Sequence, residues 1–110
     1  MTRREVFEKV KKHLLKQGQP ALNRDGECVY RSDEGLMCAV GCLIPKRLYK
    51  ASLENQSIIC PAVLEALKKA GVPTNATMVS MLVSLQTLHD GVEFEGWAEG
   101  LDRIELEFFS

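Results

Sequence analysis

The chain has 110 residues, 45% of them apolar and 26% charged, and its net charge is −1 at pH 7. This length is typical of one domain and too short for two ordinary ones, so we expect a single globular domain over residues 1–110. A core of this size needs no metal or disulfide to stabilise it. No run approaches the ~20 apolar residues of a membrane span, and no stretch resembles an export signal. We therefore expect a cytoplasmic protein with no membrane partner.

The first predicted element is a helix over residues 3–17. Thr2 and Glu5 have the spacing of a capping box, in which each residue bonds the backbone amide of the other. Apolar residues follow at helical intervals, and Gly18 provides a left-handed stop. The solvent face of this helix is rich in lysine: Lys9, Lys11, Lys12 and Lys16.

Residues 19–44 predict a short β element followed by a buried segment. Turn signals at 23–26 and 32–35 surround the β-prone run Cys28–Tyr30, which favours a β-hairpin or a small sheet. The apolar stretch 36–44 predicts a short buried helix beginning near Cys38, with a buried strand as the alternative.

Three further helices are predicted in the second half of the chain. One begins at Cys60–Pro61, because proline suits the first turn. The next is capped by Thr74 or Asn75 and is apolar enough to be the central helix. The last spans residues 97–107 with an apolar stripe. The expected fold class is α+β and predominantly α-helical, with four to five helices and a small β element near residues 20–37.

Charge is distributed unevenly along the chain. Residues 1–50 contain eleven Lys and Arg against six acidic residues, whereas residues 51–110 contain three against nine. Neutralisation of the two halves within the fold is the simpler interpretation. Two oppositely charged faces for partners, or head-to-tail association of copies, is the alternative. The formation of a homo-oligomer is therefore possible on the sequence alone.

One group of residues has the chemistry of a thiol enzyme, although the sequence lacks phosphate-loop, Rossmann and hydrolase motifs. Cys38 would be the nucleophile, with its pKa lowered at the start of a helix. His89 would take its proton and Asp90 would orient the imidazole. Gln86 would donate to an oxyanion.

The same pattern also allows a zinc site. Cys38 and Cys42 share one face of a helix, and Cys28, Cys60 or His89 would complete a tetrahedron. Strong zinc signatures contain two tight cysteine pairs, and here there is one. We therefore expect free core thiols and predict no metal and no other cofactor.

A structural role explains these residues more simply, and we prefer it. His89 and Asp90 would bond the ends of neighbouring elements. Tyr30 and Trp97 would bury their rings with their polar atoms bonded. Gly41 would let the buried segment pack closely on the central helix.

The candidate binding residues lie on the basic helix and around the cysteine–histidine region: Lys9, Lys12, Lys16, Tyr30, Gln86 and Trp97. A protein is the expected partner of these surfaces. Nucleic acid is the alternative partner of the basic helix, through salt-dependent phosphate contacts. The net negative charge and the absence of a recognisable reading helix disfavour it.

Several segments together resemble a recurrent group of small proteins from phages, prophages and bacteria. They are Tyr30–Arg31, the run Gly35–Pro45 (GLMCAVGCLIP), the run Leu85–Asp90 (LQTLHD) and Trp97. The resemblance covers roughly residues 28–105. It implies a context, that of a phage-type accessory protein, rather than a mechanism. If a phage encodes the protein, its expected location is the host cytoplasm.

The sequence thus predicts a protein that binds a host or phage macromolecule without catalysis, for example an inhibitor or an anti-defence protein. The alternative is a thiol-dependent hydrolase that uses Cys38 and His89, or a small-molecule or nucleotide-binding protein that uses the same cleft.

Overall fold

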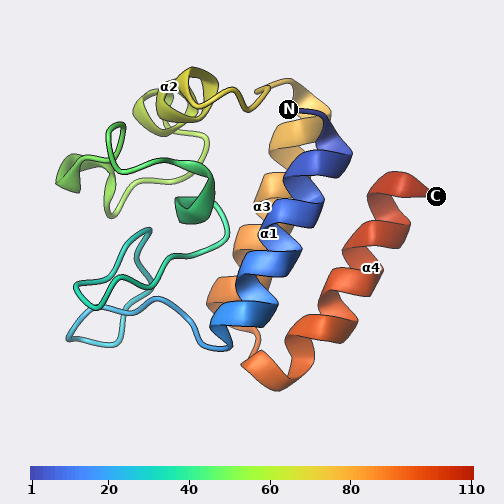
Figure 1. Ribbon diagram of the computed structural model, residues 1–110, viewed down its shortest axis with the longest axis horizontal. Helices are drawn as coiled ribbons and strands as arrows, with labels where there is room; N and C mark the ends of the chain where they lie inside the picture. The colour runs from blue at the N-terminus through green and yellow to red at the C-terminus, as the bar shows by residue number, and fades with distance from the viewer.

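The computed structural model describes residues 1–110 and contains four α-helices and three 3₁₀ turns. The helices are α1 (Arg3–Gln17), α2 (Pro61–Lys69), α3 (Ala76–Gly91) and α4 (Trp97–Phe109). Helices α1, α3 and α4 lie side by side, and α2 lies to one side of them with the long connection that precedes it (Figure 1). None of the helices has the length and apolar character needed to cross a membrane.

Local interactions define the ends of α1, as the sequence predicts. The Thr2 hydroxyl accepts from the Glu5 amide at 3.1 Å, and the Glu5 carboxylate accepts from the Thr2 amide at 2.8 Å. Gly18 follows with a left-handed φ of 69°, and its amide bonds the Leu14 carbonyl. The predicted boundaries of this helix are confirmed.

Helix α3 is the central helix, because it packs against both α1 and α4. The Asn75 side chain caps it by accepting from the Met78 amide at 2.9 Å. Gly100 on α4 allows a close approach, since a Cβ there would lie 2.3 Å from Cδ1 of Leu88. The buried apolar side chains of α3 form part of a continuous core: Met78, Met81, Leu82, Leu85 and Leu88.

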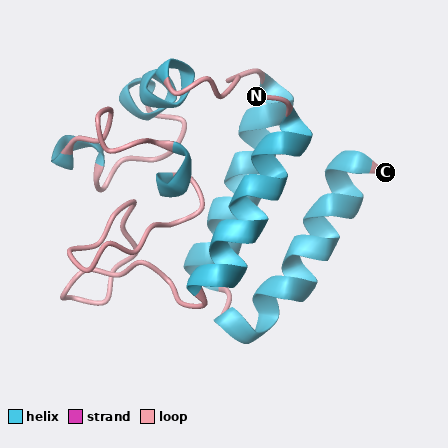
Figure 2. Ribbon diagram, in the orientation of Figure 1, coloured by secondary structure: helices cyan, strands magenta, loops and turns pink.

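The predicted β-hairpin or sheet near residues 20–37 is wrong. Figure 2 shows helices and loops only, and the segment contains two isolated bridges, Leu22 with Cys28 and Arg31 with Met37. The predicted turns do form, with left-handed glycines at Gly26 and Gly35.

Side chains explain why no ladder extends from these turns. The amides of Tyr30 and Arg31 are bonded to the Glu54 carboxylate. The next rung beyond the Arg31–Met37 bridge would need the Tyr30 amide, and the next rung beyond the Leu22–Cys28 bridge would need the Ala21 amide. Glu54 takes the first amide and Nε2 of His89 takes the second, so each bridge stays isolated.

The buried segment 36–44 is also less regular than predicted. In place of a helix from Cys38 it contains one 3₁₀ turn, Gly41–Leu43. Gly41 does permit a close approach, but its partner is not the central helix. A Cβ at Gly41 would lie 2.0 Å from the carbonyl oxygen of Tyr30, so the backbone of the preceding loop occupies that space.

Candidate functional site

The candidate site is a groove of about 270 Å³ between the C-terminal half of α3 and two loops, residues 28–30 and 54–58. This volume is just below the range of about 300–1,000 Å³ that is common for small-molecule pockets. Two carboxylates line the groove, those of Glu54 and Asp90, and no Lys, Arg or His side chain lines it. The groove therefore carries negative charge without a cation of its own.

Glu54 holds one wall of the groove in place. One of its carboxylate oxygens accepts from the Tyr30 amide at 2.9 Å. The other accepts from the Arg31 amide at 3.2 Å and from the Tyr49 hydroxyl at 2.6 Å. Since three donors from the protein already bond this carboxylate, Glu54 serves mainly to position the loop that carries Tyr30.

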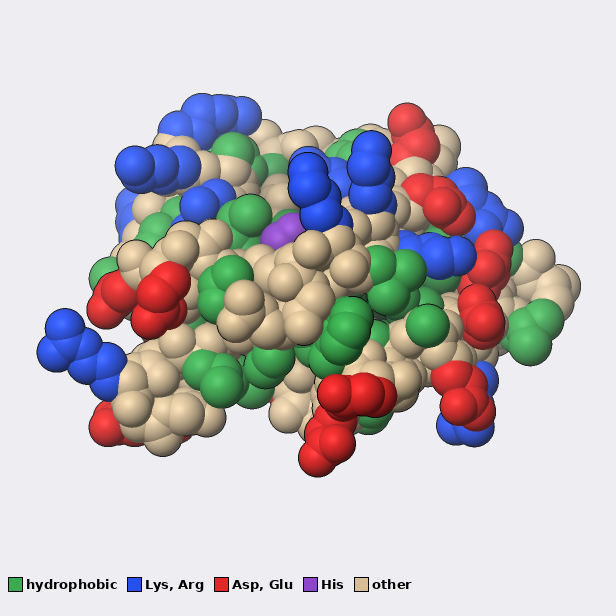
Figure 3. Space-filling view, turned by 60° about the horizontal axis from the view of Figure 1, so that its bottom comes forward, with side chains coloured by type: hydrophobic (Ala, Val, Ile, Leu, Met, Phe, Trp, Pro, Cys, Tyr) green, Lys and Arg blue, Asp and Glu red, His purple; other side chains and the backbone are tan.

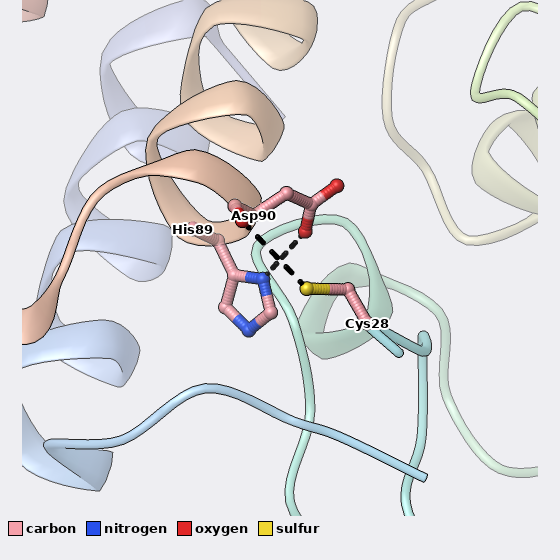
Figure 4. Close-up of side chains that lie close together, drawn as sticks. All are labelled: Cys28, His89 and Asp90. Atoms are coloured by element: carbon pink, nitrogen blue, oxygen red, sulfur yellow. Dashed lines mark hydrogen bonds and ion pairs between the residues drawn. The ribbon is translucent and has the colours of Figure 1, made fainter. Parts of the chain in front are cut away.

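Asp90 has a carboxylate that is held on one side only. Its Oδ1 accepts from Nδ1 of His89 at 2.7 Å and from Nε2 of Gln86 at 2.9 Å. Oδ2 has no partner within the protein, and 42% of the side chain is exposed. In Figure 4 one carboxylate oxygen points toward His89 and the other points away from it. The result is an oriented carboxylate with one free oxygen.

His89 is buried, and both of its ring nitrogens are in use. The backbone N–H of Ala21 donates to Nε2 at 3.0 Å, so this nitrogen carries a lone pair and not a proton. The proton of the neutral ring must then sit on Nδ1, where it is donated to Asp90. The ring also packs against Trp97, with their centroids 5.6 Å apart.

Gln86 ties Asp90 to a second backbone amide. Its Oε1 accepts from the Val40 amide at 3.0 Å while its Nε2 donates to Asp90. Two chains of hydrogen bonds therefore end on Asp90, one from the Ala21 amide through His89 and one from the Val40 amide through Gln86. This network orients the carboxylate before any ligand arrives.

Cys28 is the exposed thiol of the site. Its sulfur lies 3.9 Å from the Asp90 carbonyl oxygen (Figure 4). Partial burial raises the pKa of this thiol to about 11, and the negative charge of Asp90 adds to the shift. Cys28 is therefore a poor nucleophile at neutral pH despite its accessibility.

Cys28, His89 and Asp90 also form a group whose ligand atoms all lie within 4.8 Å of one another. A metal on Nδ1 of His89 would need the ring proton on Nε2, directly opposite the Ala21 N–H. Histidine ligands normally donate their second N–H to an acceptor, whereas here the second nitrogen faces a donor. The hydrogen bonds thus favour an oriented carboxylate over a metal centre.

The expected lowering of the Cys38 pKa is wrong. Cys38 is fully buried, and burial raises the pKa of its thiol to about 12. It does not lie at a helix N-terminus, and its sulfur accepts from the Gly41 amide at 3.2 Å. No hydrogen bond joins Cys38 to His89, whose ring nitrogens bond Ala21 and Asp90. The geometry gives a Cys38/His89 nucleophile no support.

Cys42 has a similar environment. Its thiol donates to the Ala39 carbonyl at 3.1 Å, and burial raises its pKa to about 12. The cysteine pair Cys38 and Cys42 does not join Cys60 or His89 in a group of potential metal ligands. These contacts agree with the interpretation of the pair as core residues.

The three lysines of the predicted basic face, Lys9, Lys12 and Lys16, are exposed on α1, and none of them forms an ion pair. The single ion pair between the basic helix α1 and the acidic helix α4 is Arg4–Glu105, at 2.6 Å. Figure 3 shows basic side chains gathered along the upper part of this face, whereas acidic and basic ones lie side by side at its right edge. Ion pairing within the fold thus leaves the lysines unneutralised.

Tyr30 and Trp97 are buried, and their polar atoms are bonded, as the structural interpretation predicts. The Tyr30 hydroxyl donates to the Gln56 carbonyl, and the indole N–H of Trp97 donates to the Val92 carbonyl at 2.8 Å. Tyr30 lines the groove with Gln86 and Asp90, whereas Trp97 does not. Trp97 instead packs against the His89 ring.

Sequence reasoning missed two residues on which the site depends. Glu54 lies in a stretch without periodicity, and Ala21 contributes only its backbone, so neither carries a recognisable signal. As a candidate site residue, Cys28 was predicted only as one of three optional zinc ligands. No protein-family model, curated protein or solved structure matches this chain, so its function is argued from the site itself.

Proposed function

We propose that this protein acts by binding a macromolecular partner, most simply another protein, and performs no chemistry of its own. The observation that carries the proposal is the Asp90 carboxylate, which two side chains orient while one oxygen has no partner. A group held in its binding geometry before contact loses little conformational freedom on binding, and such preorganisation favours affinity.

Both ring nitrogens of His89 already have hydrogen-bond partners within the protein, which supports binding over catalysis. A general base needs a nitrogen within reach of the proton that it abstracts. Nε2 of His89 accepts from Ala21 and Nδ1 bonds Asp90, so neither nitrogen faces the groove free. The nearest accessible thiol, Cys28, has a raised pKa, which disfavours a thiolate nucleophile.

The lysines of α1 supply a second proposed surface. Lys9, Lys12 and Lys16 recur at helical spacing on one face and lack acidic partners within the chain. An acidic surface of a partner would complement them and would speed association at low salt. The proposed partner therefore contacts the lysine face, the groove or both.

The resemblance to phage, prophage and bacterial proteins suggests an accessory role, such as inhibition of a host or defence protein. Two of the segments that carry this resemblance meet at the groove. Tyr30 comes from one, and Gln86 and Asp90 come from the other. The Val40–Gln86 hydrogen bond joins a third segment to them. This convergence supports the groove as the working part of such a protein.

Capture from a nuclease-treated bacterial lysate tests the proposal. The tagged protein is compared with Asp90→Asn, which keeps the shape of the side chain, and with the triple variant Lys9→Glu/Lys12→Glu/Lys16→Glu. We expect quantitative mass spectrometry to find at least one protein retained by the wild type and depleted at least fivefold by one of the variants.

Two results would overturn the proposal. One is an identical set of retained proteins for the wild type and both variants. The other is retention of nucleic acid alone when nuclease is omitted, with a steep loss between low and moderate salt. Urea denaturation of the variants serves as the folding control, because all four substituted positions are at least partly exposed.

A further inference from the structure

The groove offers hydrogen-bond acceptors and negative charge to whatever enters it. Its lining includes Glu54 and Asp90 and lacks any basic side chain. The free Oδ2 of Asp90 can accept further hydrogen bonds, because an ionised carboxylate provides about four acceptor sites and the donors here use those of Oδ1. An anionic ligand would meet two like charges in this groove, whereas a cation would meet unneutralised acceptors.

The wall of the groove also offers apolar surface along the same helix as this acceptor. Val83 lines the groove about two turns before Asp90 on α3, and 41% of it is exposed. Ile58 lines it from the facing loop. Lysine and arginine side chains combine an aliphatic stem with a charged end, and they place the stem along apolar surface when the end finds a carboxylate.

The size of the groove restricts the occupant. At about 270 Å³ it falls below the usual range for drug-sized ligands, so it suits a single side chain better than a nucleotide. Hot spots of protein interfaces are commonly single anchors of this kind, and arginine is among the residues enriched there.

We propose that the groove receives one basic side chain, an arginine or a lysine, from a partner protein. Its charged end bonds Oδ2 of Asp90 and its stem lies against Val83. The inference rests on the proposed binding function and specifies the chemistry of the partner. In the bound state the hydrogen bonds from His89 and Gln86 stay in place, because they use Oδ1.

Cys28 provides a built-in reporter for this preference, because it lines the groove beside Asp90. The full chain is equilibrated at pH 8.5 with three small thiols and their disulfides: cysteamine, which is cationic, 2-mercaptoethanol, which is neutral, and 3-mercaptopropionate, which is anionic. Thiol–disulfide exchange forms a mixed disulfide at Cys28 and releases one small thiol for each event. Peptide mass spectrometry gives the occupancy by each adduct.

We expect cysteamine to exceed 2-mercaptoethanol at Cys28 by about fivefold or more, since two unit charges some 4 Å apart attract noticeably even in water. Asp90→Asn should reduce this ratio to within about twofold. A matched thiol at an exposed position of α3 without charged neighbours in adjacent turns, Ser80→Cys in a Cys28→Ser background, should show no preference. Equal adducts at Cys28, or a preference that survives Asp90→Asn, would overturn the inference.

An NMR titration tests the source of the cation. Ac-Ala-Arg-Ala-NH₂ should shift the backbone amides of Val83, Gln86 and Thr87, and its citrulline counterpart, which lacks the charge, should not. Equal shifts with both peptides, or none with either, would contradict a basic side chain. Stronger shifts with spermidine than with the arginine peptide would also contradict it, because they would assign the groove to free polyamines.

The outcomes separate this inference from the proposed function. A host protein whose capture depends on Asp90, together with no charge preference at Cys28, would keep the function and remove the basic side chain. A charge preference at Cys28 with no captured protein would support a groove that prefers cations and would remove the proposed function. Concentration-dependent dimers of the wild type that disappear in the triple lysine variant would identify a second copy as the occupant and overturn the inference of a partner protein.

Discussion

The backbone N–H of Ala21 donates a 3.0 Å hydrogen bond to Nε2 of His89, although 68 positions separate the two residues. This contact determines which nitrogen of the buried ring carries the proton. His89 therefore donates to Asp90 from Nδ1, and Nε2, which accepts the Ala21 bond, is not free to act as a base.

The first prediction concerns the tautomer of His89. In two-bond ¹H–¹⁵N NMR spectra near pH 8 the ring should show a protonated Nδ1 and an unprotonated Nε2. Zinc added to the protein at equimolar micromolar concentration should leave these signals unchanged. Tight stoichiometric zinc binding that shifts Nδ1 would refute the assignment, because coordination there requires the other tautomer.

The second prediction concerns the contribution of His89 to stability. His89→Ala removes a buried ring that packs on Trp97 and leaves the buried Ala21 amide without a partner. We expect a loss of about 3 kcal/mol in the free energy of unfolding, measured by urea denaturation. Asp90→Asn should cost less than about 1 kcal/mol, because Asn keeps an acceptor at the position of Oδ1. Similar costs for both variants would argue against the network.

The third prediction compares two glycines. Gly41→Ala would place a methyl group 2.0 Å from the Tyr30 carbonyl oxygen, which belongs to the backbone and cannot rotate away. We expect a loss of about 3 kcal/mol or more, since the loop and the 3₁₀ turn must separate.

Gly91 provides the matched control, because an added Cβ there meets no atom within 4 Å and the residue ends α3. Gly91→Ala should be neutral or stabilise the protein by up to about 1 kcal/mol through helix propensity. Thermal unfolding of both variants checks the pair. A Gly41→Ala protein as stable as Gly91→Ala would contradict the close approach.

The fourth prediction concerns stability in alkaline solution. Burial raises the pKa of Cys38 from 9.0 to about 12, so the unfolded chain releases this proton at lower pH than the folded chain. The stabilising effect is complete below pH 9 and declines as the pH rises toward 12. Urea denaturation between pH 8 and pH 11 should show a shallower decline for Cys38→Ala than for the wild type. Parallel pH profiles would contradict the burial of this thiol.

The fifth prediction concerns the reactivity of Cys28. Its pKa of about 11 against the ordinary 9.0 implies that alkylation at pH 8 is about a hundredfold slower in the folded protein than in denaturant. Cys28 should still react before the buried Cys38, because it is exposed. Asp90→Asn should accelerate the reaction by removing a nearby negative charge. Faster alkylation in the native protein than in denaturant would instead indicate an activated thiol.

The sequence was sufficient to predict those parts of the fold that depend on near neighbours. The capping box of Thr2 and Glu5, the left-handed Gly18 and the Asn75 cap act over three or four residues, and each occurs as predicted. The apolar periodicity of α3 identified the central helix, because a helix repeats every 3.6 residues and places such side chains on one face. The turns around Gly26 and Gly35 were found for the same local reason.

The site required contacts between residues far apart in the chain. His89, Asp90 and Gln86 were recognised as a group, but their chemical roles depend on the amides of Ala21 and Val40. The alternative of a Cys38 nucleophile depended on a helix terminus that would lower the pKa of the thiol, whereas burial raises it. Neither effect leaves a pattern in the local sequence.

The sequence by itself thus determined the four α-helices and the turns at Gly26 and Gly35, since hydrogen bonds and apolar periodicity within a few residues specify them. Only the tertiary structure decided that residues 20–37 form loops rather than a sheet, because the side chains of His89 and Glu54 take the amides of Ala21 and Tyr30, which longer strand pairs would have used. Only the tertiary structure likewise left one oxygen of Asp90 free in a groove without a cation. Such groups compete for partners across the whole fold, and the packed arrangement of the chain selects among them.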